Sequence, residues 1–229
     1  MKIKFYAHAS FRLEGDGLAV VTDPYTPSIS NFDPINEPAD IVIMSSATDE
    51  FHCDASHVTG EPAVVNALEI PPEGGSVKGL AIRSFPAMES MTYDFQKYFQ
   101  RDPDANALYH FTLDGIRVLH MGDIGNPVAP EHLDALDGKV DLLLALTGAH
   151  ATIALDDLDT LIERVKPRAV IPMHYYSANG VLDIEPVETF TKRFAEDRVT
   201  HVGGSELELS MADLPPSGKP QIFVLDQSR

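Results

Sequence analysis

The sequence predicts an α/β fold in which β-strands form the interior and α-helices cover the outside. Residues 141–146 and 168–173 are two almost wholly apolar runs, which is typical of strands buried on both faces of a sheet. The segment between them, residues 155–165, repeats apolar residues at helical spacing. Hydrophobic residues make up 44% of the 229-residue chain, which is enough for a large core. These observations indicate a single domain that spans residues 1–229.

Strands are also predicted before and after this unit. Residues 2–7 alternate polar and apolar side chains, as a half-buried strand does. Residues 18–22 form a β-rich run that ends at a turn-forming Asp-Pro pair, and residues 40–44 are nearly all apolar. The other predicted strands cover residues 78–85, 107–113, 116–120, 206–209 and 221–225.

Turn and helix signals complete the local prediction. Asp114-Gly115 separates two predicted strands and favours a tight β-hairpin. Residues 186–195 predict a second helix, whereas residues 86–105 contain few strand or helix signals. No linker, short repeat or low-complexity tract interrupts the sequence, which agrees with a single domain.

Charge and cysteine content exclude several function classes. The chain has 35 acidic and 17 basic side chains, for a net charge of −18. This field repels phosphate groups, so nucleic acids and anionic membrane surfaces are not expected as partners. Cys53 is the only cysteine, which excludes an intrachain disulfide and fits a reducing compartment. No apolar run approaches the roughly 18 residues of a membrane span, and residues 2–7 begin a strand instead of a signal peptide. We therefore expect a soluble, cytoplasmic protein, and its oligomeric state stays open.

The loops that follow the buried strands are the expected place for chemistry. The carboxyl ends of parallel strands meet at one edge of a sheet, and binding sites are usually found there. Polar or histidine-containing segments follow four of the predicted strands, at residues 45–52, 85–89, 120–125 and 171–175. We expect these four segments to face a common cleft.

These segments belong to a series of motifs that carries a family resemblance. In chain order the motifs are His8-Ala9-Ser10-Phe11, Thr22-Asp23-Pro24-Tyr25, His120-Met121-Gly122-Asp123-Ile124-Gly125, Thr147-Gly148-Ala149-His150-Ala151-Thr152-Ile153, Lys166-Pro167-Arg168 and Ile171-Pro172-Met173-His174-Tyr175. With them the chain resembles the metallo-β-lactamase superfamily, and within it the metal-dependent hydrolases related to L-ascorbate-6-phosphate lactonase. The resemblance covers nearly all of the chain. It implies an αββα sandwich, with two mixed β-sheets flanked by helices.

The resemblance also implies where metal ligands should lie. The family's metal loop reads Ser-His-x-His-x-Asp-His, and residues 45–51 stand at that loop here. Asp123 matches the family's bridging aspartate and His174 its last histidine ligand, while Glu50 stands in place of the loop aspartate. The residues that replace the other family ligands are Ser46, Thr48, Phe51 and Pro86. This alignment predicts that most of the metal ligands have been lost.

These replacements determine the cofactor that we expect. Hydroxyl groups bind zinc poorly, and a catalytic zinc typically needs about three protein ligands, so we expect no dinuclear centre. The favoured expectation is that no cofactor is bound. The alternative is one divalent metal, zinc or manganese, bound by Glu50, Asp123 and His174.

Two function classes follow from this interpretation. The favoured one is a non-catalytic or metal-free member of the fold, which binds a small molecule or a protein partner in the old active-site cleft. The alternative is a metal-dependent hydrolase with a single divergent metal site, acting on a lactone-like or phosphorylated small molecule. Metal-free catalysis by Ser46, His174 and Asp123 is disfavoured, because no nucleophile elbow is visible.

The remaining histidines and a tyrosine each allow a structural and a functional interpretation. His52 could replace the residue before it as a ligand, but a shift of one position normally turns a side chain away. His120 is interpreted as a strand-end residue that orients its neighbours, and a hydrogen bond to the backbone is expected for His8. His150 and Tyr175 could line the cleft or serve the structure. The complete set of expected cleft-lining residues is Ser46, Thr48, Phe51, His52, Pro86, His120, His150 and Tyr175.

Overall fold

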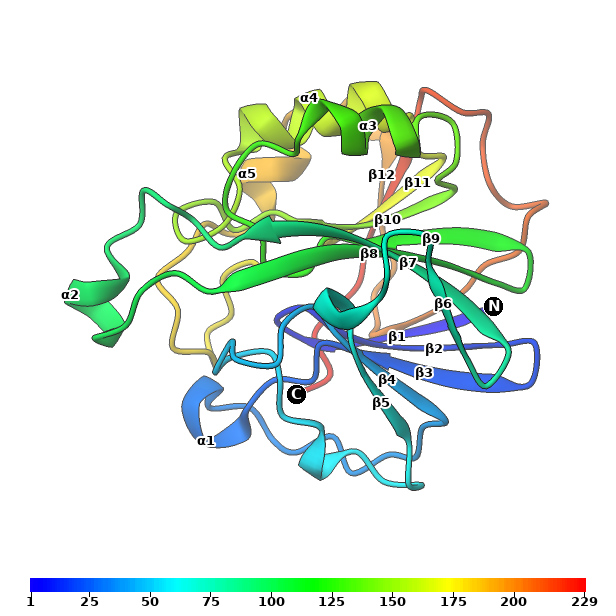
Figure 1. The fold of residues 1–229 in the computed structure, drawn as a ribbon. Helices are drawn as coiled ribbons and strands as arrows, with labels where there is room; N and C mark the ends of the chain where they lie inside the picture. The colour runs from blue at the N-terminus through cyan, green and yellow to red at the C-terminus, as the bar shows by residue number, and fades with distance from the viewer.

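Two β-sheets are stacked face to face in the computed structural model, which describes residues 1–229 (Figure 1). The first sheet is mixed, because three of its strand pairs are antiparallel and two are parallel. Its strands, in spatial order, are β13 (Glu206–Glu208), β1 (Lys2–Ala7), β2 (Ser10–Gly15), β3 (Leu18–Thr22), β4 (Ile41–Met44) and β5 (Ala63–Asn66).

The second sheet is larger and is also mixed. Four of its strand pairs are parallel and three are antiparallel. Its strands, in spatial order, are β12 (Val199–His201), β14 (Gln221–Val224), β11 (Ala169–Met173), β10 (Leu142–Leu146), β9 (Ile116–His120), β8 (Ala105–Leu113), β7 (Leu80–Met88) and β6 (Gly75–Val77).

Helices cover the outer face of the second sheet (Figure 1). These are α3 (Pro130–Leu136), α4 (Leu155–Val165) and α5 (Val187–Thr191). α1 (Pro27–Ser30) lies beside the first sheet, and α2 (Phe95–Phe99) sits on a loop that protrudes beyond the ends of β7 and β8. Three single 3₁₀ turns occur at Ala55–His57, Ala67–Glu69 and Glu196–Arg198. None of the helices is long and apolar enough to cross a membrane.

The main core fills the space between the sheets and beneath the helices. It contains 48 buried hydrophobic residues, and a separate cluster of 10 lies on the other side of the first sheet. Alternation along β1 separates the two, because Ile3 and Phe5 face the main core whereas Tyr6 faces the smaller cluster. The αββα sandwich of two mixed sheets is therefore confirmed.

Several predicted elements match the structure at both ends. β1, β3, β9 and α4 have the predicted bounds, and the hairpin turn between β8 and β9 is formed by Asp114 and Gly115, with φ values of 48° and 74°. α5 ends at Thr191, four residues earlier than predicted from the range 186–195. β2, β5, β6, β12, α1, α2 and α3 were not predicted from the sequence. β6 and β12 are three residues long, and such short strands exist through pairing with a neighbour rather than through a pattern of their own.

Candidate metal centre

Five buried histidine and aspartate side chains meet at the edge where strands of both sheets end. His8 lies in the turn between β1 and β2, and His174 directly follows β11. Asp49 and His52 belong to the loop after β4, and Asp123 belongs to the loop after β9. We call these residues the five-residue cluster. Because four separate loops supply them, only the folded chain brings them together.

His52 lies at the centre of the cluster. Its ligand atoms and those of His8 and His174 lie within 4.8 Å of one another, and the same holds for the group of Asp49, His52 and Asp123. The Nδ1 atom of His52 is 2.9 Å from Oδ2 of Asp49 and 3.6 Å from Oδ2 of Asp123. Its Nε2 atom is 3.2 Å from Nδ1 of His8. On the far side, Nε2 of His174 is 3.7 Å from Oδ1 of Asp123.

Two histidines of the cluster have a left-handed backbone conformation. The φ angles are 50° at His8 and 51° at His174. For a residue other than glycine this conformation costs about 1–2 kcal/mol, and such positions are concentrated at functional sites. The backbone N–H of His174 donates a hydrogen bond of 2.8 Å to the carbonyl of His8, which fixes the two turns to each other. The backbone of the fold therefore fixes the positions of these two histidines relative to each other.

The loop that carries Asp123 is held by two side chains beneath it. The side-chain oxygen of Asn106 accepts a hydrogen bond of 2.9 Å from the Asp123 backbone N–H. Nδ1 of His120 accepts one of 2.9 Å from the Gly122 backbone N–H, and Nε2 of His120 donates one of 2.8 Å to the carbonyl of Ala9. Burial lowers the pKa of His120 to about 3, so the ring is neutral. With both nitrogens engaged, His120 orients the loop and does not line the cleft.

Electrostatics divide the three histidines of the cluster into two kinds. Burial alone would lower the pKa of His52, but the carboxylates of Asp49 and Asp123 outweigh it and raise that pKa to about 10. Burial and the charge of His52 lower the pKa of His174 to about 3. Burial, with its neighbouring histidines, also lowers the pKa of His8 far below the usual range. His8 and His174 are therefore neutral imidazoles, the form that binds metals, whereas His52 carries an extra proton that a bound metal would displace.

Three buried atoms of the cluster have no hydrogen-bond partner. They are the two ring nitrogens of His174 and Oδ1 of Asp123. A buried polar atom without a partner costs about 1–3 kcal/mol. A divalent cation would give partners to Oδ1 of Asp123 and one nitrogen of His174, and imidazole and carboxylate donors together suit zinc or manganese. The residues present thus fit a metal ion.

The loop after β4 corrects the ligand assignment made from sequence. Glu50 is exposed and belongs to neither ligand group, whereas Asp49 is fully buried and belongs to one. Phe51 packs its ring against His8, and His52 supplies the imidazole instead. The His52 backbone N–H donates to the Asp49 carbonyl at 3.2 Å, so the chain makes one turn and both side chains face the cluster. The sequence signal that could have identified these two residues is their Asp-x-x-His spacing, which differs from the directly adjacent Asp-His of the family loop.

This correction changes the interpretation of the whole site. The prediction that the metal site is degenerate is not supported, because five side chains with ligand atoms still converge. The prediction that no cofactor is bound loses its basis for the same reason.

The hydroxyl residues of the loop lie outside the cluster. The hydroxyl groups of Ser46 and Thr48 are 3.2 Å apart, and Thr48 donates a hydrogen bond of 3.1 Å to Asp104. Pro86 is an exposed residue of β7 opposite Ala107 of β8. None of these three replacements belongs to a ligand group.

Aromatic rings cover one side of the cluster. Phe51 stacks on His8 with ring centroids 6.1 Å apart and meets the edge of Phe99 at 5.3 Å. Asp123 has 10% of its side chain exposed, against 1% for His174. The cluster therefore opens toward solvent on the side of Asp123.

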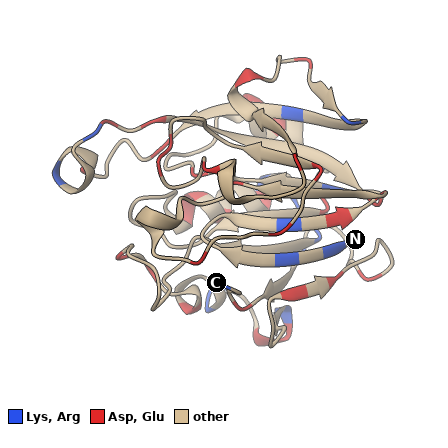
Figure 2. Cartoon of the chain, turned by 90° about the horizontal axis from the view of Figure 1, so that it is seen from below, with Lys and Arg blue, Asp and Glu red and all other residues tan.

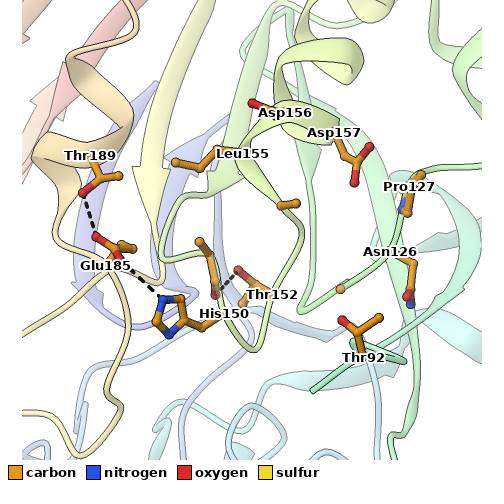
Figure 3. Close-up of a pocket in the computed structure, with 13 residues that line it drawn as sticks. Thr92, Asn126, Pro127, His150, Thr152, Leu155, Asp156, Asp157, Glu185 and Thr189 are labelled. Atoms are coloured by element: carbon orange, nitrogen blue, oxygen red, sulfur yellow. Dashed lines mark hydrogen bonds and ion pairs between the residues drawn. The ribbon is translucent and has the colours of Figure 1, made fainter. Parts of the chain in front are cut away.

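A pocket of about 560 Å³ is lined in part by Gly125 and Asn126, which follow Asp123 in the same loop, although none of the five cluster residues lines it (Figure 3). The loops after β9 and β10 form it together with the start of α4. Ile153, in the second of these loops, donates a backbone hydrogen bond of 2.9 Å to Ile124, the residue after Asp123. His150 lines the pocket, with its Nε2 atom 3.4 Å from Oε1 of Glu185. His150 thus belongs to this outer pocket and lies outside the five-residue cluster.

Tyr175 has a structural role. Its hydroxyl donates a hydrogen bond of 2.8 Å to the carbonyl of Leu225, and its ring lies 5.9 Å from that of Phe5. The side chain thus ties the end of β11 to the C-terminal segment and does not line the pocket of Figure 3.

Comparisons with known proteins give one family and several relatives. A family model described as a beta-lactamase superfamily domain matches residues 2–174. A UPF0173 protein from Pyrococcus furiosus is 27% identical over 208 residues, which cover 87% of this chain and 93% of the relative. A UPF0173 metal-dependent hydrolase from Thermococcus onnurineus is 27% identical over 196 residues, which cover 76% of this chain and 84% of that relative.

A solved structure from Thermotoga maritima has the same fold over nearly its whole length. It is described as a candidate zinc-dependent hydrolase of the metallo-beta-lactamase superfamily. The TM-score is 0.73 at 26% sequence identity, and the match covers 98% of this chain and 97% of the other.

Proposed function

Because the chain belongs to the beta-lactamase superfamily, we propose that it is a metal-dependent hydrolase that uses one divalent metal ion. The five-residue cluster would hold this ion, and zinc and manganese are the ions that its donors fit. The relatives described as metal-dependent and zinc-dependent hydrolases support the proposal. They favour it over the non-catalytic or metal-free member that the sequence analysis preferred.

The observation that carries the proposal is the unpaired state of buried atoms in the cluster. Both nitrogens of His174 and one oxygen of Asp123 have no partner, although these side chains are almost completely buried. Natural proteins pair buried polar groups with protein atoms, ordered water or ions, so these converging atoms call for a bound partner. Nearby, neutral His8 adds another nitrogen donor. A site of this kind suits a cation better than it suits an apolar ligand.

The residues of the chain divide the chemical work among them. When bound, the metal lowers the pKa of a coordinated water to about 7 and polarises the bond to be cleaved. Asp49 holds the ring of His52 in place through its contact with Nδ1. Asp123 lies at the open side of the cluster, and the loop that carries it continues, from Gly125, into the lining of the pocket where a substrate would be placed. His150, which lines that pocket beside Glu185, would be the group that passes a proton to the leaving group.

The lining of the pocket favours an uncharged substrate. Asp156, Asp157 and Glu185 place carboxylates on it (Figure 3), and the whole chain carries a net charge of −18. A phosphorylated molecule would be repelled by these groups. The pocket volume of about 560 Å³ suits a small molecule. We therefore propose a neutral, lactone-like substrate rather than a phosphorylated one.

The test combines metal content with hydrolysis. The purified protein is analysed for metals and assayed on lactones, esters and phosphodiesters, with and without added zinc or manganese. We expect about one metal ion per chain and a metal-stimulated rate on lactones. Asp123→Asn should lower that rate at least about 100-fold, because it removes a carboxylate ligand. Glu50→Gln is the control, since Glu50 is exposed and lies outside both ligand groups.

Two results would contradict the proposal. The first is a purified protein that takes up no metal even at an excess of zinc or manganese. The second is one equivalent of metal without any metal-stimulated hydrolysis across the panel, which would favour a binding role for the cleft. Faster hydrolysis of phosphodiesters than of lactones would support the proposed hydrolase activity but contradict the proposed lactone-like substrate.

A further inference from the structure

We propose that His8 is a direct ligand of the metal, so that the ion lies among the imidazoles of His8, His52 and His174. Asp123, whose Oδ1 lies 3.7 Å from Nε2 of His174, is the unpaired carboxylate beside these rings. Asp49 then contacts His52 and not the metal, which makes it a positioning residue. The inference rests on the proposed function in one respect, because it concerns the same ion.

The three imidazole rings surround a common point. Their centroids are 5.3 Å apart for His8 and His52, 5.1 Å for His8 and His174, and 5.0 Å for His52 and His174. A tetrahedral zinc ion with Zn–N bonds of about 2.05 Å, and about 1.1 Å more to each ring centre, places ligand rings about 5.2 Å apart. The observed triangle has this size on all three sides. Three separate segments of chain supply its corners.

The nitrogen atoms agree with the ring positions. Nδ1 of His8 and Nε2 of His52 are 3.2 Å apart. Two nitrogens bound to one tetrahedral zinc ion lie about 3.3 Å apart. Nδ1 of His52 is turned to Asp49, and a histidine that binds a metal through one nitrogen commonly donates its other N–H to a carboxylate. His52 therefore presents Nε2, the nitrogen nearer to His8, to the ion.

Hydrogen bonding distinguishes Asp49 from His174 and Asp123. Oδ1 of Asp49 accepts from the backbone N–H of Phe51 at 2.9 Å, and its Oδ2 lies 2.9 Å from His52. Both oxygens are thus engaged within the loop. In contrast, Oδ1 of Asp123 and both nitrogens of His174 have no partner. His174 and Asp123 thus have unpaired atoms for the ion, whereas Nδ1 of His8 and Nε2 of His52 contact each other at 3.2 Å and would exchange that contact for the ion.

His8 is fixed in its position. Its carbonyl accepts the backbone hydrogen bond of His174, and its ring meets the edge of Phe32 with centroids 5.1 Å apart. A side chain held in this way needs little rearrangement to bind an ion, which favours a rigid site. Three imidazoles and one carboxylate also favour zinc over magnesium or calcium, which prefer oxygen donors.

The test measures metal binding instead of turnover. Zinc affinity is determined by competition with a chelator, and the absorption spectrum of the cobalt-substituted protein reports the coordination. His8→Asn is the main variant, because asparagine tolerates a left-handed backbone and removes the imidazole. Asp49→Asn keeps an oxygen that can accept from His52, and His201→Ala controls for loss of an exposed histidine on β12.

We expect His8→Asn to weaken zinc binding more than about 100-fold, beyond the range typical of residues that only support a ligand. It should also change the cobalt spectrum. Asp49→Asn should weaken binding about 10-fold or less and keep the spectrum, and His201→Ala should change neither. His8→Ala serves as a second variant, and thermal unfolding without metal checks that each variant folds.

The outcomes separate this inference from the proposed function. One equivalent of zinc bound equally well by the wild type and His8→Asn would overturn the inference and leave the hydrolase proposal intact. A loss of more than about 100-fold for Asp49→Asn, with His8→Asn unaffected, would assign the ligand role to Asp49. A wild-type protein that binds no zinc would contradict both this inference and the proposed function.

Discussion

Glycine at position 122 decides where Asp123 lies. Gly122 has a φ of 60°, and a Cβ atom there would overlap the carbonyl of Ala107, the side chain of Asn106 and the side chain of Ser45. The backbone N–H of the next residue, Asp123, donates its hydrogen bond to the side-chain oxygen of that same Asn106. Gly148 has a related role, because a Cβ atom there would overlap the carbonyl of His174. Two of the proposed ligands are thus positioned by neighbours that lack a side chain.

A pair of glycine variants tests this role. Gly138 has a φ of 64°, close to that of Gly122, but a Cβ atom there would meet nothing within 4 Å. Gly138→Ala should therefore cost about 1 kcal/mol from backbone strain alone. Gly122→Ala adds steric overlap of about 1–3 kcal/mol and should also weaken metal binding. Urea unfolding and zinc titration provide the measurements. Equal losses of stability in the two variants would show that close packing at Gly122 is unimportant.

At the scale of elements, one buried carboxylate joins three strands of the second sheet. Asp141, just before β10, accepts hydrogen bonds of 2.8 and 2.9 Å from the guanidinium of Arg117 in β9. Its backbone carbonyl accepts from the N–H groups of Arg168 and Ala169 at the start of β11. These contacts fix the register at the amino ends of three parallel strands. The loops at their opposite ends carry Asp123 and His174, so the register also places the ligands.

Asp141→Asn should lower the stability of the fold in a pH-dependent way. Burial alone would raise the pKa of Asp141, but the bonds from Arg117 outweigh it and hold that pKa below its usual value. A lowered pKa in the folded state means that the stabilisation is present above the unfolded pKa of about 3.9 and is lost as the pH falls through the folded value.

The expected result is a loss of about 1–2 kcal/mol at pH 7, which shrinks as the pH falls below about 4. Urea unfolding of the variant and the wild type between pH 3 and pH 7 measures it. Asp137→Asn is the control, because the ion pair of Asp137 with Lys166 is half exposed at both ends and should contribute little. A constant difference across this pH range would exclude the ionic explanation.

On the scale of the whole molecule, charge restricts the partners. Figure 2 shows acidic residues spread over loops, helices and strands, whereas basic residues occur in fewer places. The net charge of −18 surrounds the molecule with a negative potential that repels polyanions. The absence of nucleic acid partners and the cytoplasmic location stay predictions from composition.

We predict that the protein does not bind RNA or DNA in about 0.15 M salt. The reason is electrostatic, since binding would bring phosphates close to an acidic surface without the basic groups that release counterions. Fluorescence anisotropy of labelled single-stranded and double-stranded oligonucleotides is the measurement, with a basic nucleic-acid-binding protein as positive control. Saturable binding at this salt concentration would refute the prediction.

Much of the fold could be predicted from local patterns in the sequence. The apolar run of β10 and the periodic apolar positions of α4 each contain their own signal, because burial repeats along the element with its geometric period. The turn at Asp114-Gly115 is likewise local, since its two positive φ angles suit these residues. The sequence also indicated that Asp123 and His174 follow the ends of buried strands, which are β9 and β11 on either side of β10.

Only the tertiary structure decided which side chains of the loops face the cluster. An alignment without gaps assigned the ligand role to Glu50, but the turn from Asp49 to His52 buries those two residues and leaves Glu50 in solvent. His8 was expected to be a structural residue and is one of the converging histidines. A loop has no repeating geometry, so the direction of each side chain depends on contacts with distant segments. For His8 that contact is a hydrogen bond to His174, which lies 166 positions further along the chain.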